Sequence, residues 1–397
     1  MLPITLYGAF ARLLNAFIPI KKKTWVFGAD YGKSYREGSK YLLEYMLKNH
    51  PDYNCCFLTW SSQVYDDLRA KGIPVEMNYS LKGIFKAVKA ECVFTTQTTA
   101  DIHFTYKKHD RRFFYLVHGQ PLKIAQSALK DTAYWKKYHK KESVLVRFKE
   151  WLTHFFNDGY SMNDVEFVAA TSDFLKPYME KDFGNKPPVK VMGMPRNDAL
   201  FQPERMGKEK WVNGTERKFV ITYMPTHRAY GKGQASPTPF KDRPDIQRWM
   251  RENDVVLLVK NHPNMIKQCK SFYSSDCIID ITTQRIDPQV AIYHSDVLVT
   301  DFSSVWMDYL LLRRPIIFYI YDDFEHNDVG CHYDIRKNPP GHFCYSEDEF
   351  FELIKKTKFH YDAMKPSDEI VGMYHKYVDG KACERYFNLI GNGTMQK

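Results

Sequence analysis

The chain has 397 residues, of which 44% are hydrophobic and 26% charged, a composition that is ordinary for globular proteins and excludes an intrinsically disordered chain. Its formal net charge of +10, from 57 Lys and Arg residues against 47 Asp and Glu residues, favours an anionic partner such as nucleic acid, acidic lipid or a sugar phosphate. The length allows two α/β domains, each with its own core.

Residues 1–23 predict an amphipathic helix. Large apolar residues share one helical face and a run of lysines closes the segment: Leu6, Phe10, Leu13, Leu14 and Phe17, then Lys21, Lys22 and Lys23. A secretory signal carries its charge before the apolar part, so this order disfavours one. Because no run of about eighteen apolar residues occurs, no transmembrane helix is predicted. We expect an anchor lying in an anionic membrane surface or, alternatively, a helix packed on its own domain.

Residues 24–205 alternate short apolar runs with amphipathic stretches, which predicts a Rossmann-like domain. The apolar runs lie at 24–29, 55–60, 92–96, 113–117, 166–170 and 189–192. His118 follows the run at 113–117 directly, and Gly119 comes next. A histidine at the carboxyl end of a buried strand faces the ligand, and the pKa of imidazole lies near neutrality. His118 is therefore a candidate general base.

Residues 123–157 predict a basic helical patch within this domain. Its Lys and Arg side chains are interleaved with Tyr134, Trp135, Tyr138 and Trp151. Basic and aromatic side chains together suit nucleic acid or a surface of lipid headgroups, but no nucleic-acid-binding motif accompanies them. A merely solvated helix face is the remaining alternative.

The eight cysteines include no CxxC pair, and Cys55 and Cys56 are adjacent. Adjacent cysteines fit poorly into a disulfide framework, so the sequence predicts a reducing compartment. We therefore expect a peripheral protein on the cytoplasmic face of the cell membrane.

Residues 218–397 predict a second Rossmann-like domain, which follows a polar linker and ends in a helix that could pack back on the first domain. Apolar strands are expected at 219–223, 255–259, 297–300 and 315–319. Polar segments follow the first three of these strands and supply candidate ligand-binding residues: Pro225, Thr226, His227 and Arg228, then Asn261 and His262, then Asp301, Ser303 and Ser304.

The segment 296–323 predicts a strand, a tight polar turn, a helix and a second strand. Ser303 and Ser304 lie in the turn, where helix-capping hydroxyls, unpaired backbone N–H groups and the positive end of the helix dipole would converge. This is the environment that a phosphate group needs. An ordinary strand-to-helix cap is the alternative.

Seven motifs, in order along the chain, resemble those of one known family. They are SYREGSKYLLEYM (34–46), VHGQPLK (117–123, similar to HGTPLK), GMPRND (193–198, similar to GxPRND), YMPTHR (223–228), KNHPN (260–264), TDFSSVWMDYLLLRRPIIFY (300–319) and NPPGHF (338–343). The family is that of the CDP-glycerol glycerophosphotransferases of teichoic-acid and related cell-surface polymer synthesis. Gln120 stands where this family usually has Thr.

The resemblance implies a GT-B fold, in which two Rossmann-like domains face a central cleft. It implies transfer of glycerol phosphate from CDP-glycerol to a lipid-linked acceptor, with release of CMP. His118 and His262 are the expected catalytic residues. The expected donor-binding residues are Arg228, Thr226, Asp301, Ser303, Ser304, Pro225 and Asn261. The expected acceptor or cleft residues are Gly119, Gln120, Lys123, Arg196, Asn197 and Asp198.

No DxD motif lies at a strand end of the first domain, and Asp322-Asp323 is the nearest imitation. No metal and no other cofactor is therefore predicted. Three alternatives stay open: a ribitol-phosphate transferase using CDP-ribitol, a GT-B glycosyltransferase using another nucleotide sugar, and a basic non-enzymatic scaffold for an anionic polymer or RNA. No specific nucleic-acid partner is expected, and paired histidines at strand ends favour an enzyme over the scaffold.

Overall fold

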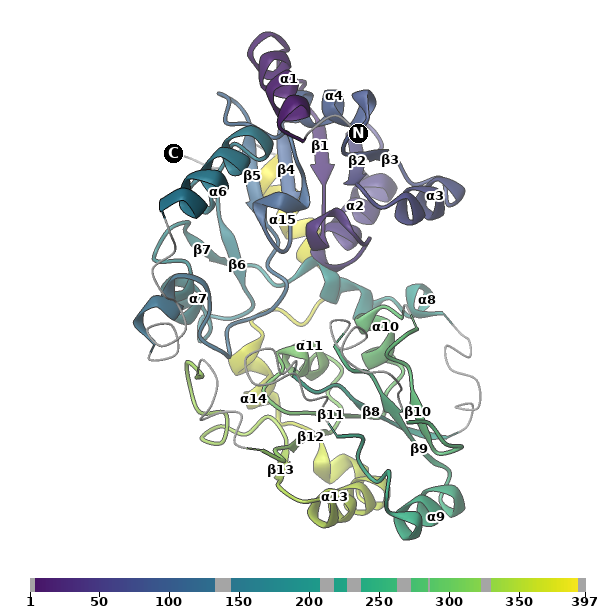
Figure 1. Ribbon diagram of the computed structural model, residues 1–397. Helices are drawn as coiled ribbons and strands as arrows, with labels where there is room; N and C mark the ends of the chain where they lie inside the picture. The colour runs from purple at the N-terminus through teal and green to yellow at the C-terminus, as the bar shows by residue number, and fades with distance from the viewer. Residues whose placement is uncertain are drawn as a thin grey trace. The chain divides into compact units, whose positions relative to one another are not determined.

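The computed structural model describes residues 4–132, 144–207, 218–226, 237–262, 273–284, 286–322 and 330–391. Contacts divide the chain into two compact units, which Figure 1 shows with their helices and strands labelled. The described residues of unit 1 are 4–118, 144–198 and 381–391, and those of unit 2 are 119–132 and the described part of 199–380. We expected domains at 24–205 and 218–397, with a final helix that could pack back on the first domain. In the structure, 119–132 lie with unit 2 instead, and 381–391, which include the final helix, lie with unit 1.

Unit 1 contains a five-stranded parallel sheet with the order β3-β2-β1-β4-β5. Its strands are β1 (Thr24–Phe27), β2 (Asn54–Thr59), β3 (Val75–Met77), β4 (Cys92–Thr95) and β5 (Arg112–Tyr115). A separate parallel pair consists of β6 (Val168–Ala170) and β7 (Val189–Val191). The α/β class predicted from the alternating pattern is confirmed.

Helices cover both faces of the five-stranded sheet. The α-helices of unit 1 are α1 (Ile4–Phe17), α2 (Glu37–Asn49), α3 (Ser62–Ala70), α4 (Leu81–Lys89), α6 (Val144–Asn157), α7 (Lys176–Asp182) and α15 (Ala382–Gly391). Successive side chains of a strand point to opposite faces. Trp25 and Phe27 pack with α2 and α15 on one face, whereas Val26 packs with α1 and α4 on the other.

Helices α1 and α6 lie against each other in unit 1. Gly8 of α1 permits this approach, because a Cβ atom there would lie 2.3 Å from the carbonyl oxygen of Phe156. The hydroxyl of Tyr106 donates to the carbonyl oxygens of Gly8, at 2.9 Å, and Phe156, at 2.6 Å. Arg12 donates to the carbonyl oxygen of Phe155. The two helices are thus held together by hydrogen bonds to backbone carbonyl groups as well as by packing.

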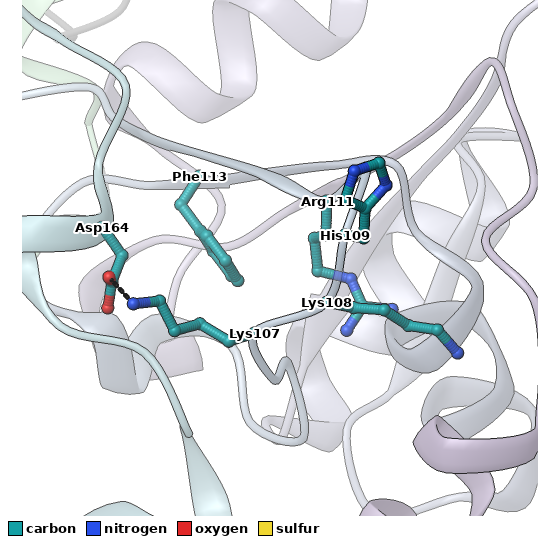
Figure 2. Close-up of a pocket in the computed structure, with 6 residues that line it drawn as sticks. All are labelled: Lys107, Lys108, His109, Arg111, Phe113 and Asp164. Carbon is teal, nitrogen blue, oxygen red and sulfur yellow. Dashed lines mark ion pairs between the residues drawn. The ribbon is translucent and has the colours of Figure 1, made fainter.

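A pocket of about 430 Å³ opens beside the first residue of β5 (Figure 2). Its lining residues are Lys107, Lys108, His109, Arg111, Phe113 and Asp164. Four of them belong to the segment that leads into β5, Phe113 lies in the strand itself, and Asp164 ends the 3₁₀ helix η4 (Met162–Asp164). The pocket therefore lies at the amino end of the strand, away from the edge where His118 follows β5.

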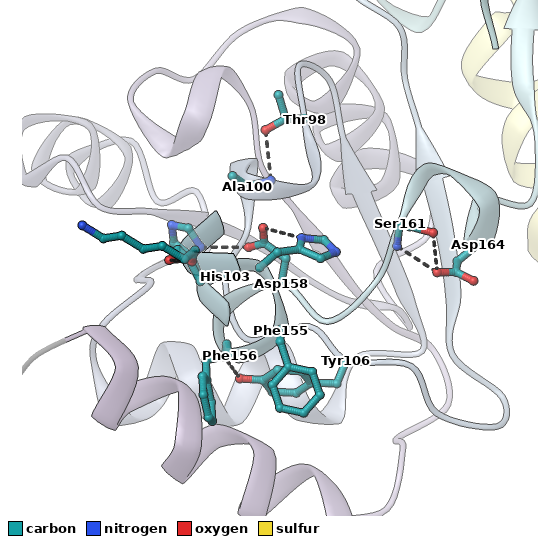
Figure 3. Close-up of polar contacts among 12 residues, drawn as sticks. Thr98, Ala100, His103, Tyr106, Phe155, Phe156, Asp158, Ser161 and Asp164 are labelled. Carbon is teal, nitrogen blue, oxygen red and sulfur yellow. Dashed lines mark hydrogen bonds and ion pairs between the residues drawn. The ribbon is translucent and has the colours of Figure 1, made fainter. Parts of the chain in front are cut away.

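The carboxylate of Asp158 lies between two histidines just after the end of α6 (Figure 3). Its oxygens lie 3.1 Å from Nδ1 of His103 and 3.4 Å from Nδ1 of His154. Burial alone would raise the pKa of Asp158, but the hydrogen bonds with both histidines lower it. The same contact raises the pKa of His154. Asp158 thus connects α6 to the segment that follows the 3₁₀ helix η2 (Thr99–Asp101).

Unit 2 contains a six-stranded parallel sheet with the order β10-β9-β8-β11-β12-β13. Its strands are β8 (Phe219–Tyr223), β9 (Val255–Val259), β10 (Ile278–Asp280), β11 (Val297–Thr300), β12 (Ile316–Tyr319) and β13 (His342–Cys344). Its α-helices are α8 (Pro203–Met206), α9 (Pro244–Glu252), α10 (Pro288–Tyr293), α11 (Val305–Leu310), α13 (Glu347–Phe359) and α14 (Asp368–Tyr374). The core beside α9 and α13 is formed by apolar side chains of all six strands.

The segment after His118 packs on unit 2. The backbone N–H of Ile124 donates to the carbonyl oxygen of Gly330 at 3.0 Å, and that of His332 donates to Leu122 at 2.8 Å. Lys123 and Cys331 form an antiparallel bridge between these two hydrogen bonds. Lys123 and Lys130 of the expected basic patch therefore lie in unit 2, while α6 lies in unit 1. Residues 133–143 of the patch are outside the described residues.

Candidate active site

The carboxyl edge of the unit 1 sheet carries His118, two residues beyond the buried Leu116 that still donates its N–H to Thr95 at 2.7 Å. Arg196 donates to the carbonyl oxygen of His118 and also pairs with Glu37 at 2.5 Å. Arg196 is only 7% exposed, so its charge is compensated by Glu37 at a nearly dry position. The expected cleft residue Arg196 thus holds the backbone of the expected base.

The His118 side chain itself is exposed to solvent. Its surroundings lower the pKa of His118: loss of hydration acts first, and Arg196 and Arg36 act in the same direction. Glu37 and a hydrogen bond with the backbone of Thr96 oppose this shift. A lowered pKa keeps the imidazole neutral at cellular pH, which is the state that accepts a proton.

Asp101 fixes the loops beside His118. It is fully buried and accepts hydrogen bonds from the N–H groups of Tyr31, Thr96 and Gln97, at 2.7, 2.7 and 2.8 Å, and from the hydroxyl of Thr96 at 3.2 Å. Burial raises the pKa of Asp101, and these four donors oppose that effect. Tyr31 follows β1 and Thr96 follows β4. Asp101 therefore joins the two loops at the point where the strand order reverses, the usual ligand position in open α/β sheets.

Thr226 and Asp301 form the corresponding contact in unit 2. Asp301 is fully buried and accepts the N–H of Thr226 at 2.8 Å and its hydroxyl at 2.6 Å. Thr226 and the buried Pro225 follow β8, and Asp301 follows β11, the strand next to β8 where the order of this sheet reverses. Two of the expected donor-binding residues are thus in direct contact at the switch point of the sheet.

Ser303 and Ser304 are half-buried in the turn between β11 and α11. Ser304 occupies the N-cap position, but its side chain makes no capping hydrogen bond, so the predicted capping role of this hydroxyl is wrong. Within the described part of the chain, neither serine hydroxyl is committed to a hydrogen bond. A Cβ atom on Gly119 would lie 2.8 Å from the Ser304 oxygen, so a larger residue there would displace this hydroxyl. The expected cleft residue Gly119 thus lies against the expected donor-binding residue Ser304.

Asn261 and His262 follow β9. Asn261 is buried, and its backbone N–H and its side-chain amide both donate to the hydroxyl of Thr282, at 2.9 and 3.3 Å. The amide also reaches Asp280 at 3.4 Å. The hydrogen bonds hold the loop in place, and the adjacent His262 side chain is exposed. His262 belongs to unit 2 and His118 to unit 1.

The remaining expected residues have varied positions. Gln120 and Asn197 are buried, and Lys123 is half-buried. Asp198 accepts the N–H groups of Ala382 and Cys383, at 2.8 and 2.7 Å, and so caps the N-terminus of α15. Arg228 and His227 are outside the described residues.

Two residues of this edge were missed in the sequence. Glu37 lies within the quoted segment 34–46, and a carboxylate directly before an apolar helix could have been noted there. Asp101 was missed because Tyr31, the partner that links it to the loop after β1, lies 70 residues away in the sequence. Among the described residues, no group of three or more His, Cys, Asp or Glu side chains is arranged as a metal site. No described helix is long and apolar enough to cross a membrane.

The model of the CDP-glycerol:poly(glycerophosphate) glycerophosphotransferase family matches residues 10–392. The chain belongs to this family. Its resemblance to the family, seen first in seven short motifs, is thereby confirmed over nearly the whole chain.

Curated relatives carry teichoic-acid names. The chain is 26% identical over 361 residues to the teichoic acid poly(glycerol phosphate) polymerase of Bacillus subtilis (strain 168), which covers 87% of the chain and 45% of the relative. It is 25% identical over 366 residues to the teichoic acid glycerol-phosphate transferase of Staphylococcus aureus (strain NCTC 8325 / PS 47), covering 88% and 85%. The chain thus spans less than half the length of the first relative.

A solved structure of a variant of the wall teichoic acid polymerase TagF aligns with 98% of the chain and 93% of that structure, with a TM-score of 0.75 and 20% identity. This likeness confirms the GT-B fold. The UDP complex of the S. aureus protein MnaA aligns with a TM-score of 0.52 and 13% identity, covering 96% and 98%. The fold is therefore shared by proteins with different names, and the choice of donor has to come from the site.

Proposed function

We propose that this protein transfers glycerol phosphate from CDP-glycerol to a lipid-linked acceptor in teichoic-acid or related polymer synthesis, and releases CMP. The observation that carries the proposal is the position of His118. Its solvent-accessible imidazole, whose pKa is lowered by its surroundings, follows a buried strand, and Arg196 holds its backbone. Family membership across residues 10–392 supports the choice of reaction.

In this reaction an acceptor hydroxyl attacks the phosphorus atom that carries glycerol. His118 accepts the hydroxyl proton, a P–O bond forms to the acceptor, and the bond to the CMP oxygen breaks. The electron pair of that bond leaves with CMP. Such transfers depend mostly on positioning and on neutralising charge on the phosphoryl oxygens. The arrangement of Asp101, Glu37 and Arg196 supports positioning on the His118 side, because all three are hydrogen-bonded and Asp101 and Arg196 are buried.

On the donor side, Ser303 and Ser304 would donate their hydroxyls to the diphosphate, with Arg228 as the cation. Asp301 would keep Thr226 in place, since it accepts hydrogen bonds from both the N–H and the hydroxyl of Thr226. His262 would form a hydrogen bond with the bridging phosphate, on a loop held by Asn261. Charge-assisted contacts of this kind are shorter and stronger than neutral ones.

The test of the catalytic role is His118→Ala, with His360→Ala on an exposed turn of unit 2 as the matched control. We expect His118→Ala to lower turnover by about a hundredfold or more while the affinity for CDP-glycerol changes little. The control should keep wild-type values for both. Wild-type turnover of His118→Ala at neutral pH would contradict the proposal.

CDP-ribitol is the second candidate donor, because the chain is also 30% identical over 233 residues to the teichoic acid poly(ribitol-phosphate) polymerase of Bacillus spizizenii (strain ATCC 23059 / NRRL B-14472 / W23), covering 56% of the chain and 37% of the relative. Calorimetric titration with CDP-glycerol, CDP-ribitol, a UDP-sugar and RNA separates the alternatives. Tighter binding of CDP-glycerol than of the other three is expected.

We further propose that the protein binds the cytoplasmic face of the membrane through the surface formed by α1, α4 and α6. Helix α1 contacts both other helices. Large exposed apolar side chains lie on all three: Leu6, Phe10, Leu13 and Phe17; Leu81 and Phe85; Val144, Leu145, Val146, Phe148, Trp151 and Phe155. Arg147 and Lys149 are exposed on α6 as well. An apolar surface with basic side chains on it suits an anionic bilayer.

Substitution tests this placement better than deletion does. Ala11 is buried in the core of unit 1, and Leu14 and Ile18 pack on the same core, so deleting residues 1–23 would uncover it. Leu13→Glu with Phe17→Glu changes only side chains that are 59% and 78% exposed. We expect this double variant to keep its melting temperature and to float poorly with anionic liposomes. Wild-type flotation would exclude the membrane surface proposed here.

A further inference from the structure

Two cations in the pocket beside β5 have no carboxylate partner among the described residues. Arg111 is 6% exposed. It donates to the carbonyl oxygens of Ala90, Tyr106 and Val88 and to the side-chain oxygen of Asn15. The ammonium of Lys108 donates to the carbonyl oxygens of Asn15 and Ile18, the latter at 2.6 Å. These acceptors satisfy hydrogen bonds but carry no net charge.

The charges of Lys108 and Arg111 act on each other. Burial lowers the pKa of Arg111 to about 10. Burial also lowers the pKa of Lys108, and the charge of Arg111 adds to this effect. Cations at such positions are normally compensated by an anion. A negatively charged group in the pocket would remove this imbalance.

The outer part of the pocket adds a third cation. Lys107 has a 68% exposed side chain and pairs with Asp164, whose carboxylate is already held by the N–H and the hydroxyl of Ser161, at 2.8 and 3.0 Å. His109 is exposed and lies 2.9 Å from Asp110. Figure 2 shows Lys107 directed toward Asp164, with Lys108 and Arg111 on the other side of the pocket. Three permanent cations therefore face one carboxylate, in a volume that admits a phosphate group.

The pocket adjoins the surface formed by α1, α4 and α6. Lys108 and Arg111 both bind Asn15, and Lys108 also binds Ile18, just after α1 ends. The exposed Leu13 and Phe17 belong to this same last turn of the helix. A lipid whose chains contact these side chains would have its headgroup at the depth of the lysines.

We propose that this pocket binds the phosphate of an anionic lipid headgroup, with Lys107 and Lys108 as its direct donors and Arg111 as the buried charge behind them. The proposal rests on the membrane location proposed above. It assigns unit 1 a lipid site at the amino edge of its sheet, distinct from the carboxyl edge that carries His118.

The experiment compares Lys107→Gln with Lys149→Gln in the full chain. Lys149 is an exposed lysine of α6 outside the pocket, so each variant loses one charge from the same side of unit 1. Partitioning is measured on phosphatidylcholine vesicles whose negative charge comes either from phosphatidic acid or from a fatty acid. On phosphatidic acid, we expect Lys107→Gln to weaken partitioning about fivefold more than Lys149→Gln does; on the fatty acid, the two variants should agree within about twofold.

A second measurement identifies the source of the phosphate. Short-chain dihexanoyl phosphatidic acid, below its micelle concentration, and inorganic phosphate are titrated against the wild type and Lys107→Gln. We expect the lipid to bind about tenfold more tightly than inorganic phosphate, and Lys107→Gln to lose most of that affinity. Equal binding of the two ligands would make this a site for soluble phosphate and overturn the lipid assignment.

The remaining outcomes are distinguishable. If Lys107→Gln and Lys149→Gln weaken partitioning equally on both vesicle types, the pocket contributes only general charge and the proposal is wrong. If the wild type does not bind anionic vesicles at all, the membrane location itself fails.

Discussion

The two sheets of this protein carry a fully buried aspartate in matching places. In unit 1, Asp101 follows β4 and binds the loop after β1; in unit 2, Asp301 follows β11 and binds the loop after β8. In each sheet these two strands are neighbours at the point where the strand order reverses. In both sheets, therefore, a buried aspartate joins the two loops at the point where the strand order reverses.

What differs is the chemistry next to each aspartate. Beside Asp101, the carboxyl edge of unit 1 carries a histidine with a lowered pKa and a largely buried ion pair between Arg196 and Glu37. Beside Asp301, unit 2 has two serine hydroxyls without a committed partner in the described chain and the exposed His262. A proton acceptor on one edge and phosphate donors on the other match the two substrates of the proposed transfer. The comparison shows that the same aspartate-to-loop contact can support different chemistry in the side chains next to it.

Replacing Asp101 should have the largest effect. Asp101→Ala leaves three N–H groups and one hydroxyl without their acceptor. The two donors of Thr96 are buried and those of Tyr31 and Gln97 partly buried, and an unpaired buried group costs about 1 to 3 kcal/mol. We expect the free energy of unfolding to fall by roughly 3 to 5 kcal/mol in urea titrations. Asp101→Asn keeps one acceptor oxygen and should lose less. A loss in Asp101→Ala below that in Asp301→Ala would break the proposed ranking.

Asp301→Ala should have the second largest effect on stability, because Asp301 accepts hydrogen bonds from the N–H and the hydroxyl of Thr226. A loss of about 2 to 3 kcal/mol in unfolding free energy is expected. Unlike Asp101→Ala, it should also weaken CDP-glycerol binding, since it releases the turn that carries Thr226. Calorimetry at a temperature where the variant stays folded measures this. Unchanged donor affinity would place the donor away from this edge.

Asp198→Ala tests a carboxylate of unit 1 that has a capping role. It removes the acceptor for the first N–H groups of α15, and loss of such a cap costs about 1 to 2 kcal/mol. Asp198→Asn should recover most of that loss. Thermal unfolding of both variants gives the answer. A large drop in turnover with unchanged stability would assign Asp198 to the acceptor instead.

The smallest effect is expected for Asp158 and depends on pH. The pKa of His154 is raised above its ordinary value of 6.5, so its contribution to stability is complete below that value and disappears as the pH rises through the folded pKa. The pKa of Asp158 is lowered from 3.8, so its contribution disappears as the pH falls through the folded pKa. Asp158→Asn should therefore destabilise the protein more at about pH 5.5 than at about pH 8.5. Equal losses at both pH values would contradict this linkage.

Much of the unit 2 sheet could be predicted from the sequence. The strands β8, β9 and β11 match the predicted ranges 219–223, 255–259 and 297–300, because each is an apolar run with polar residues on both sides. β5 ends at Tyr115, although the prediction extended to Val117, which is still buried. Apolar sequence reports burial, whereas a strand requires the hydrogen-bond ladder as well.

The contacts of the site could be predicted only in part. Thr226, Asp301 and Ser304 were named from their place after strands, and the structure puts Thr226 against Asp301. The role of Asp198 could not be seen, because its partners lie 184 and 185 residues away. The packing of 119–132 on unit 2 is equally non-local, since nothing in VHGQPLK itself specifies which sheet edge receives it.

The order of the chain also constrains synthesis. Cys383, Tyr386 and Ile390 of α15 complete the core around Trp25 in unit 1, and they follow all of unit 2 in the sequence. During synthesis, all of unit 2 therefore emerges from the ribosome before α15 can complete the core of unit 1. Trp25 lacks these neighbours until then. Domains made from one continuous segment can fold as they emerge. Here the amino-terminal unit is the later of the two to be finished.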